Sequence, residues 1–191
     1  MARSREFDVD QAVERAMELF WGRGYAATSL QDLTAELGIG SGSLYAAFGS
    51  KEQLYARALG RYCSAYAGAL IAELESAPDV RSALRAALIA MVEADVHDPS
   101  RGCFLVNAVT ERPADPATAD RATATLRLVE GTIAGALERA QARGDLPGDK
   151  DTAGLARFLT TFVQGLRVMG KARADRVFLD SAVSHALSVL D

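Results

Sequence analysis

Apolar residues recur along almost the whole chain with the spacing of amphipathic helices, and Ala and Leu dominate their apolar faces. No segment shows the alternation of Val, Ile or Thr with polar residues that is typical of strands. The pattern predicts helices over residues 9–21, 29–37, 43–48, 51–75, 80–96, 101–111, 117–143, 151–170 and 174–190. We therefore expect an all-α protein.

Polar and glycine residues mark where the first helices should begin and end. Asp8 and Thr28 precede the first two apolar runs and are good N-caps. Ser50 opens a Ser-x-x-Gln capping box, which should start a much longer fourth helix. Gly40 and Gly42 predict a tight turn between the second and third helices. Three short helices arranged in this way predict a helix-turn-helix.

The third predicted helix has two different faces. Leu44 and Phe48 are four residues apart, so both should face the preceding helices and anchor the third helix to them. Tyr45 should point away from this core. Ser41 and Ser43 would place hydroxyl and amide groups at a helix N-terminus, where phosphate oxygens bind readily. The outward face therefore suits a groove of DNA.

The stretch GYAATSLQDLTAELGIGSGSLYAAFGSKEQLYARAL, residues 24–59, resembles the DNA-binding module of TetR/AcrR-type transcriptional regulators. The resemblance lies in a G-Y-x-x-T-S run, a glycine turn, L-Y-x-x-F and a following K-E-x-L. It implies an amino-terminal helix-turn-helix domain, residues 1–50, followed by a larger helical ligand-binding and dimerisation domain, residues 51–191. It also implies a homodimer that binds a palindromic double-stranded DNA operator, usually as a repressor, and is released by a small-molecule effector.

The same resemblance implies which residues contact DNA, mostly through phosphates: Thr28, Ser41, Gly42, Ser43, Leu44, Tyr45 and Lys51. The sequence departs from the family pattern after Tyr45, where Ala46 and Ala47 replace a second aromatic residue and a histidine. Few side chains of this helix can therefore form hydrogen bonds to bases, although the alanine methyl groups could contact thymine methyl groups. Arg3 and Arg5 could reach a minor groove.

The second part of the chain combines long helices, apolar faces and no catalytic cluster. This suits a cavity between helices together with a dimer face. We expect a small apolar or electrophilic effector to enter between the fourth helix and those at 80–96, 101–111 and 151–170. The expected ligand-binding residues are aromatic, sulfur-containing or amide side chains: Tyr66, Met91, Cys103, Phe104, Asn107 and Phe162. Phe158, Phe162, Leu166 and Met169 could serve either the cavity or the dimer.

Cys103 has two alternative interpretations. In the first turn of its predicted helix, shortly after Arg101, its thiolate would be favoured by the helix N-terminus and the guanidinium. The run R-G-C-F-L-V-N is similar to one in TetR-type regulators that sense electrophiles or oxidants through a cysteine. Alternatively, Cys103 is a small buried residue that packs under Phe104. Cys63 is expected in the core.

Net charge decides little about a nucleic-acid partner. The chain of 191 residues carries a net charge of −4, which by itself does not indicate DNA binding. Residues 1–62, however, hold seven Lys or Arg and eight Asp or Glu, so their net charge is only −1. A nearly neutral amino-terminal part permits DNA binding without predicting it.

Other classes of function find little support. The chain lacks a long apolar run and a signal-peptide-like start, which predicts a cytoplasmic protein without membrane contact. Two cysteines and two histidines supply no metal site, and neither histidine stands near a nucleophile motif. We therefore expect neither an enzyme nor a cofactor. The remaining alternative is a helix-turn-helix protein that lacks tight operator binding and acts through ligand or protein contacts.

Overall fold

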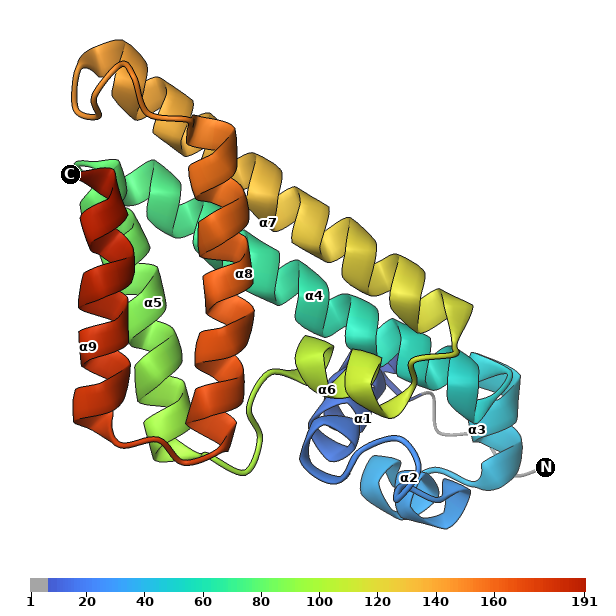
Figure 1. Cartoon of the computed structure of the whole chain (residues 1–191). Helices are drawn as coiled ribbons and strands as arrows, with labels where there is room; N and C mark the ends of the chain where they lie inside the picture. Colours follow the sequence, from blue (N-terminus) through green and yellow to red (C-terminus); the bar gives the residue numbers. More distant parts are fainter. Residues whose placement is uncertain (1–6) are drawn as a thin grey trace.

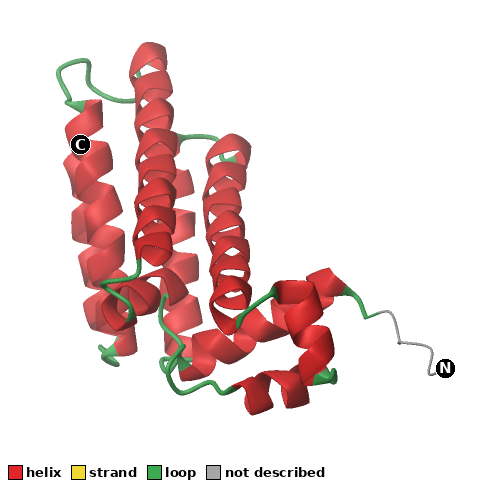
Figure 2. Ribbon diagram, turned by 90° about the vertical axis from the view of Figure 1, so that its right-hand side faces the viewer, coloured by secondary structure: helices red, strands yellow, loops and turns green. Residues whose placement is uncertain are grey.

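A computed structural model describes residues 7–191, so Arg3 and Arg5 lie outside the described residues. Within residues 7–191 the chain is helical, with no strand (Figure 2), and the predicted all-α fold is confirmed. The helices are α1 (Val9–Arg23), α2 (Leu30–Leu37), α3 (Ser41–Phe48), α4 (Lys51–Ser76), α5 (Val80–His97), α6 (Phe104–Glu111), α7 (Pro116–Arg143), α8 (Thr152–Lys171) and α9 (Arg176–Leu187). A 3₁₀ turn, Ser188–Leu190, follows α9.

The helices form two groups that α4 joins (Figure 1). Helices α1, α2 and α3 pack together beside the first turns of α4. Helices α5, α8 and α9 stand side by side at the other end, and α7 lies along α4. Because α4 contacts α1 as well as α5 and α7, one helix connects the amino-terminal group to the carboxy-terminal group.

Each of the two groups of helices has its own apolar core. The core of the amino-terminal group also contains residues of α6, which lies in the second part of the chain. Phe104 and Leu105 of α6 are buried with the apolar residues of α1, α2 and α3. The second core lies among α5, α7, α8 and α9. Tyr66, near the middle of α4, packs against both cores. The position of α6 is therefore part of what holds the amino-terminal helices in place.

The start of α2 differs from the prediction. Ser29, not Thr28, is its N-cap: Ser29 Oγ accepts a hydrogen bond from Asp32 N at 3.0 Å, and the Asp32 carboxylate accepts one from Ser29 N at 2.8 Å. This reciprocal capping box lowers the pKa of Asp32. The prediction for Thr28 was wrong because its buried hydroxyl donates to Gly24 O at 2.7 Å instead.

Other helix starts also differ from the predicted positions, and those of α3 and α6 have a clear local cause. The turn before α3 lies earlier than expected, because Gly38 ends α2 in the left-handed region and Gly40 is already the N-cap of α3. Ser41 therefore stands in the first turn of α3. Helix α6 begins at Phe104 rather than 101, because Gly102 has φ +60° and Cys103 is the N-cap. Asp8 caps α1 as predicted.

Candidate DNA-binding surface and effector cavity

Helix α3 is held by its apolar face and presents the opposite one. Leu44 and Phe48 are almost fully buried, as their spacing predicted. Tyr45 is 46% exposed, and Ser41 and Ser43 are exposed in the first turn. The first backbone N–H groups of a helix have no acceptor within it, so this turn offers donors to an anion. The expected orientation of α3 is confirmed.

Two residues expected to contact DNA are placed where their side chains cannot do so. Thr28 and Leu44 are both fully buried. The hydroxyl of Thr28 is bonded to Gly24 O, and Leu44 packs in the first core. Both residues lie beneath the candidate DNA-binding surface and support it. DNA contacts by Ser41, Gly42, Ser43, Tyr45 and Lys51 remain predictions.

Lys51, the first residue of α4, lies against an aromatic ring. Its Nζ is 4.1 Å from the centroid of the Tyr25 ring, a distance suited to a cation–π interaction. Partial burial lowers the pKa of Lys51. Tyr25 also donates its hydroxyl hydrogen to Glu52 at 2.5 Å. The turn between α1 and α2 is thus tied to the start of α4.

The end of α6 holds the same turn through a contact that we call the Glu111 clamp, formed by Glu111, Tyr25 and Ala26. The Glu111 carboxylate accepts hydrogen bonds from the backbone N–H groups of Tyr25 and Ala26, both at 2.8 Å. The guanidinium of the next residue, Arg112, lies 3.8 Å from the Tyr25 ring centroid. Sequence reasoning missed this clamp, because a glutamate at a helix end carries no signal of so distant a partner.

A cavity of about 270 Å³ lies between α4, α5 and α8, in the region where an effector cavity was expected. Its size follows from alanines on facing helices, which leave space that larger side chains would fill. The lining residues are Tyr62, Tyr66, Ala69, Leu70, Glu73, Ala86, Ala87, Ala90, Met91, Ala94 and Arg167. Tyr66 and Met91 were expected there. Ligand binding by either residue remains a prediction.

The other four expected ligand-binding residues do not line this cavity. Phe104 is buried in the first core, and Phe162 packs on Phe158 with ring centroids 6.2 Å apart. Asn107 donates to Arg101 O at 2.8 Å and accepts from Lys171 Nζ at 2.7 Å, so both ends of its amide are engaged. Phe104 and Asn107 instead border a separate hollow of about 320 Å³ next to α1.

Cys103, the fourth of these residues, lies directly behind the cavity wall. Its side chain is buried, and Tyr62, which lines the cavity, donates a hydrogen bond to Cys103 Sγ at 3.4 Å. The Arg101 guanidinium was expected to lie near the Cys103 thiol. It pairs with Glu18 and Asp98 instead. Cys63 is buried in the first core as expected, and burial raises the pKa of its thiol.

Arg167 brings a buried positive charge to the cavity wall. It is 6% exposed and pairs through Nη1 with Asp95 Oδ1 at 2.9 Å. Nη1 also donates to Met91 O at 3.0 Å, and Nη2 donates to Gly102 O at 2.7 Å. Burial raises the pKa of Asp95, while the charge of Arg167 opposes that rise. Sequence analysis did not predict this ion pair, because each residue alone resembles an ordinary polar helix position.

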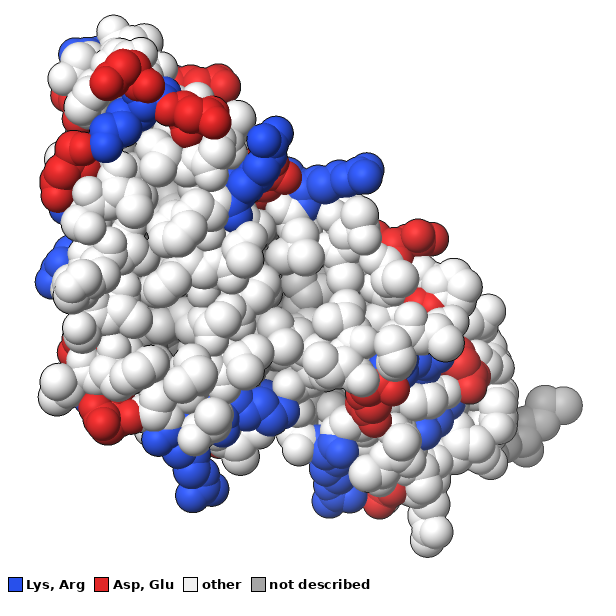
Figure 3. Space-filling view, viewed as in Figure 1, with Lys and Arg blue, Asp and Glu red and all other residues white. Residues whose placement is uncertain are grey.

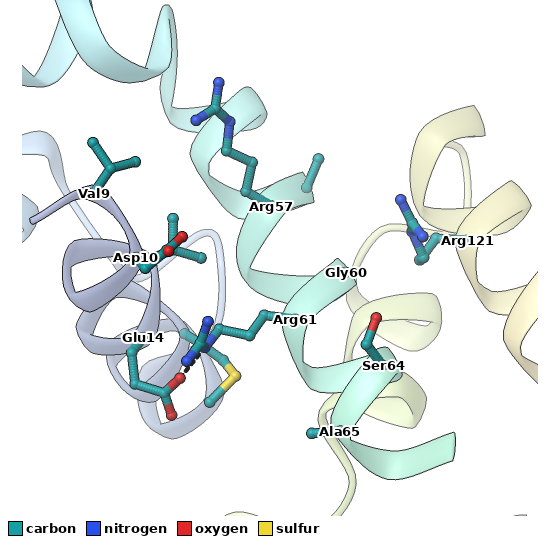
Figure 4. A pocket seen from close by; sticks show the side chains of 12 residues that line it. Val9, Asp10, Glu14, Arg57, Gly60, Arg61, Ser64, Ala65 and Arg121 are labelled. Carbon is teal, nitrogen blue, oxygen red and sulfur yellow. Dashed lines mark hydrogen bonds and ion pairs between the residues drawn. The ribbon is translucent and has the colours of Figure 1, made fainter. Parts of the chain in front are cut away.

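A larger hollow, of about 1030 Å³, lies between α1 and α4 (Figure 4). Glu14 of α1 pairs with Arg61 of α4 across its floor, and Arg57 and Arg121 stand on its sides. This hollow is an open groove with several charged groups. It therefore lacks the enclosed, mainly apolar character that is typical of sites for small ligands.

Exposed apolar side chains gather on the carboxy-terminal helices. Large examples that are more than a third exposed are Leu128, Phe158, Val168, Met169, Val177 and Phe178, from α7, α8 and α9. The face that carries α8 is nearly free of charged side chains over its centre (Figure 3). Exposed apolar side chains on an uncharged face are typical of a surface that contacts another macromolecule.

Two family models match the chain. The model of bacterial regulatory proteins of the tetR family covers residues 12–58, and the tetracyclin repressor-like C-terminal domain covers residues 71–186. The chain belongs to the TetR family. The resemblance of residues 24–59 to this family and the predicted helix-turn-helix fold are thereby confirmed. Because the TetR family consists of DNA-binding transcriptional regulators, the expectation that this chain is not an enzyme is also confirmed.

Alignments with two curated relatives cover most or all of the chain. It is 36% identical over 195 residues to the HTH-type transcriptional regulator YezE of Bacillus subtilis, with 100% of both chains covered. It is 35% identical over 175 residues to the HTH-type transcriptional repressor ComR of Escherichia coli, covering 90% of this chain and 83% of ComR. A cysteine mutant of the TetR-family regulator CifR, solved with 26-base-pair operator DNA, superposes with a TM-score of 0.87. That comparison covers 100% of both chains at 36% identity.

Residues 7–191 lack two features that are typical of other classes of protein. No helix within residues 7–191 combines the length and apolar character needed to cross a membrane. In the same part of the chain, no three His, Cys, Asp or Glu side chains gather as a possible metal site.

Proposed function

We propose that this TetR-family regulator is a cytoplasmic repressor that binds a palindromic operator as a homodimer and is released by a small effector. The observation that carries the proposal is α3, whose buried face fixes it while its first turn and Tyr45 remain exposed. Similarity to the repressor ComR, and to CifR solved with operator DNA, supports the same conclusion.

On this proposal, DNA docks against the start of α3 and the start of α4. Ser41, Gly42 and Ser43 offer amide and hydroxyl groups to phosphates, while Tyr45 enters the groove. Lys51 adds a positive charge beside the Tyr25 ring. One α3 has too few polar groups for specific binding, so two copies must act on neighbouring half-sites.

The exposed apolar side chains of α8 and α9 supply the proposed dimer interface. Phe158, Val168 and Met169 of α8, together with Val177 and Phe178 of α9, would be buried against the same residues of a second copy. Leu166 is already buried within one chain, which leaves Phe158 and Met169 for the partner. A domain boundary at residue 50 remains part of the proposal, with α4 serving both domains.

The proposed effector site is the cavity between α4, α5 and α8. Its alanine-rich wall suits a small, mainly apolar body. An electrophile in this cavity would reach Cys103 only past Tyr62. Reversible binding therefore has the more direct support, and electrophile sensing by Cys103 depends on movement of Tyr62.

A gel-shift assay with the DNA upstream of the protein's own gene tests the proposal. We expect a shift at micromolar dimer or below that competitor DNA of unrelated sequence does not abolish. Absence of a specific shift, with the dimer intact by light scattering, would contradict the repressor proposal. It would favour the alternative of a helix-turn-helix protein that acts through ligand or protein contacts.

A further inference from the structure

One backbone oxygen links the effector cavity to the DNA-binding helices. Gly102 O accepts the hydrogen bond from Arg167 Nη2 at 2.7 Å and a second from Trp21 Nε1 at 3.1 Å. Arg167 lines the cavity, whereas Trp21 belongs to α1. The guanidinium of Arg101, next to Gly102 in sequence, lies 5.0 Å from the Trp21 ring centroid. The segment before α6 thus contacts both parts of the molecule at one point.

Local backbone geometry holds this oxygen in place. Gly102 is buried and has φ +60°, a conformation that L side chains rarely adopt. A Cβ atom there would lie 2.9 Å from Lys171 Cδ and 3.1 Å from Lys171 Cβ, so a side chain at this position would require Lys171 of α8 to shift. The carbonyl can therefore lose a hydrogen bond only if Arg167, Trp21 or the segment itself moves.

The charges around the cavity indicate what kind of ligand it accepts. Asp95 already neutralises Arg167 at 2.9 Å, and burial raises the pKa of Tyr66 to about 12, so its phenol stays neutral. An anion would bring an uncompensated charge into a partly buried site and would also meet the carboxylate of Glu73. A cationic group would pair with Glu73 but offers no acceptor to the donors Arg167 and Tyr66. An uncharged molecule with a hydrogen-bond acceptor avoids the first cost and meets these donors.

The cavity volume indicates how large a part of a ligand the protein can surround. A water molecule occupies about 30 Å³ of liquid, so the cavity holds roughly nine water-sized groups. The alanines of α5 present an apolar surface for the body of such a ligand, and the donors Arg167 and Tyr66 stand on the other helices.

We propose that the effector is a small uncharged hydrogen-bond acceptor that draws Arg167 away from Gly102 O, and that the loosened carbonyl transmits this change to Trp21 and α1. The inference rests on the proposed function and specifies its ligand class and its route of coupling. A ligand acts in this way only if it binds the displaced arrangement more tightly than the original one.

The unmodified protein tests the route directly, because it contains one tryptophan and therefore gives one indole ¹H–¹⁵N resonance. The probes are acetophenone, which has a carbonyl acceptor, ethylbenzene, which has none, and benzoate, which is charged. Acetophenone should bind and shift the indole resonance. At equal occupancy, measured by calorimetry, ethylbenzene should not shift it, and benzoate should bind at least about tenfold more weakly. The proposal is wrong if acetophenone and ethylbenzene shift the resonance equally. It is also wrong if acetophenone shows no binding at concentrations up to about 10 mM.

Two variants separate binding from transmission. Trp21→Phe removes the indole donor but keeps an aromatic ring, so acetophenone should bind within about twofold of the parent affinity. Half-release of operator should then need about tenfold more acetophenone. Arg167→Lys should weaken acetophenone about tenfold and leave ethylbenzene unchanged. Release of Trp21→Phe at the parental concentration would overturn the route through Gly102. If the parent protein binds no operator, the repressor proposal fails, while the indole resonance still decides the coupling.

Discussion

Replacement of Glu111 by Gln isolates the contribution of the Glu111 clamp. The carboxylate accepts two backbone hydrogen bonds at 2.8 Å, in an exposed position that resembles a helix N-cap. Gln keeps one acceptor oxygen but turns an NH₂ group toward the second backbone N–H. Loss of an N-cap costs about 0.5–2 kcal/mol, so we expect Glu111→Gln to lower the free energy of unfolding by about 1 kcal/mol. For a chain of this size, the midpoint of thermal unfolding should fall by about 2–4 °C.

The same change should be visible in DNA binding and in local dynamics. If the clamp holds the turn before α2 in the position that DNA requires, about 1 kcal/mol corresponds to roughly fivefold weaker operator binding for each protomer. Hydrogen exchange at the amides of Tyr25 and Ala26 should also become faster. All measurements use one fixed protein concentration, because the stability of a dimer depends on it.

A matched control separates the clamp from the loss of one negative charge. Glu138 is exposed on α7 and has no hydrogen bond or ion pair among the contacts of residues 7–191. Glu138→Gln should leave the unfolding midpoint and the operator affinity unchanged. If Glu111→Gln behaves like Glu138→Gln in both measurements, the reasoning about the clamp is refuted.

Three further predictions concern the DNA surface, the dimer and the thiol. Tyr45→Ala should weaken operator binding about tenfold, and Lys51→Ala should lower the salt slope by about one, both without loss of the helical circular-dichroism signal. Unchanged affinity in both variants would remove the proposed docking face. Phe178→Asp should place a charge in the dimer interface and give a monomer by light scattering at micromolar concentration, and a stable dimer would exclude α9 from that interface. If Cys103 senses electrophiles, Cys103→Ser should fold and bind operator but resist release by N-ethylmaleimide, whereas release equal to that of the parent would exclude thiol sensing.

The fold was predictable where it depends on residues close together in sequence, as in helix capping and the spacing of apolar residues. The spacing of Leu44 and Phe48 predicted the buried face of α3, and Asp8 marked the start of α1. The same reasoning chose Thr28 over Ser29 as a cap, because two adjacent hydroxyls give the same local signal. The backbone of the preceding turn decides between them by directing Thr28 toward Gly24 O.

The region of the cavity was predicted, with Tyr66 and Met91 in its wall, but its other lining residues and its connections were not, because they depend on how distant helices meet. The alanines Ala86, Ala90 and Ala94 predict a helix, but not that the facing helix leaves space beside them. The pair of Arg167 with Asp95 joins α8 to α5, and the Glu111 clamp joins α6 to the turn before α2. Each residue alone would also fit a solvated position, so only the three-dimensional arrangement identifies its partner.

The composition of α3 has a consequence for how binding specificity can change. Its anchors, Leu44 and Phe48, are on the buried face, whereas Ala46 is exposed. A longer polar side chain at position 46 would extend toward DNA without displacing the core. With alanine there, we expect discrimination between operators to depend mainly on groove shape and half-site spacing. The surface is thus open to redesign: Ala46→Asn or Ala46→Arg could add a preference for adenine or guanine while the fold stays as it is.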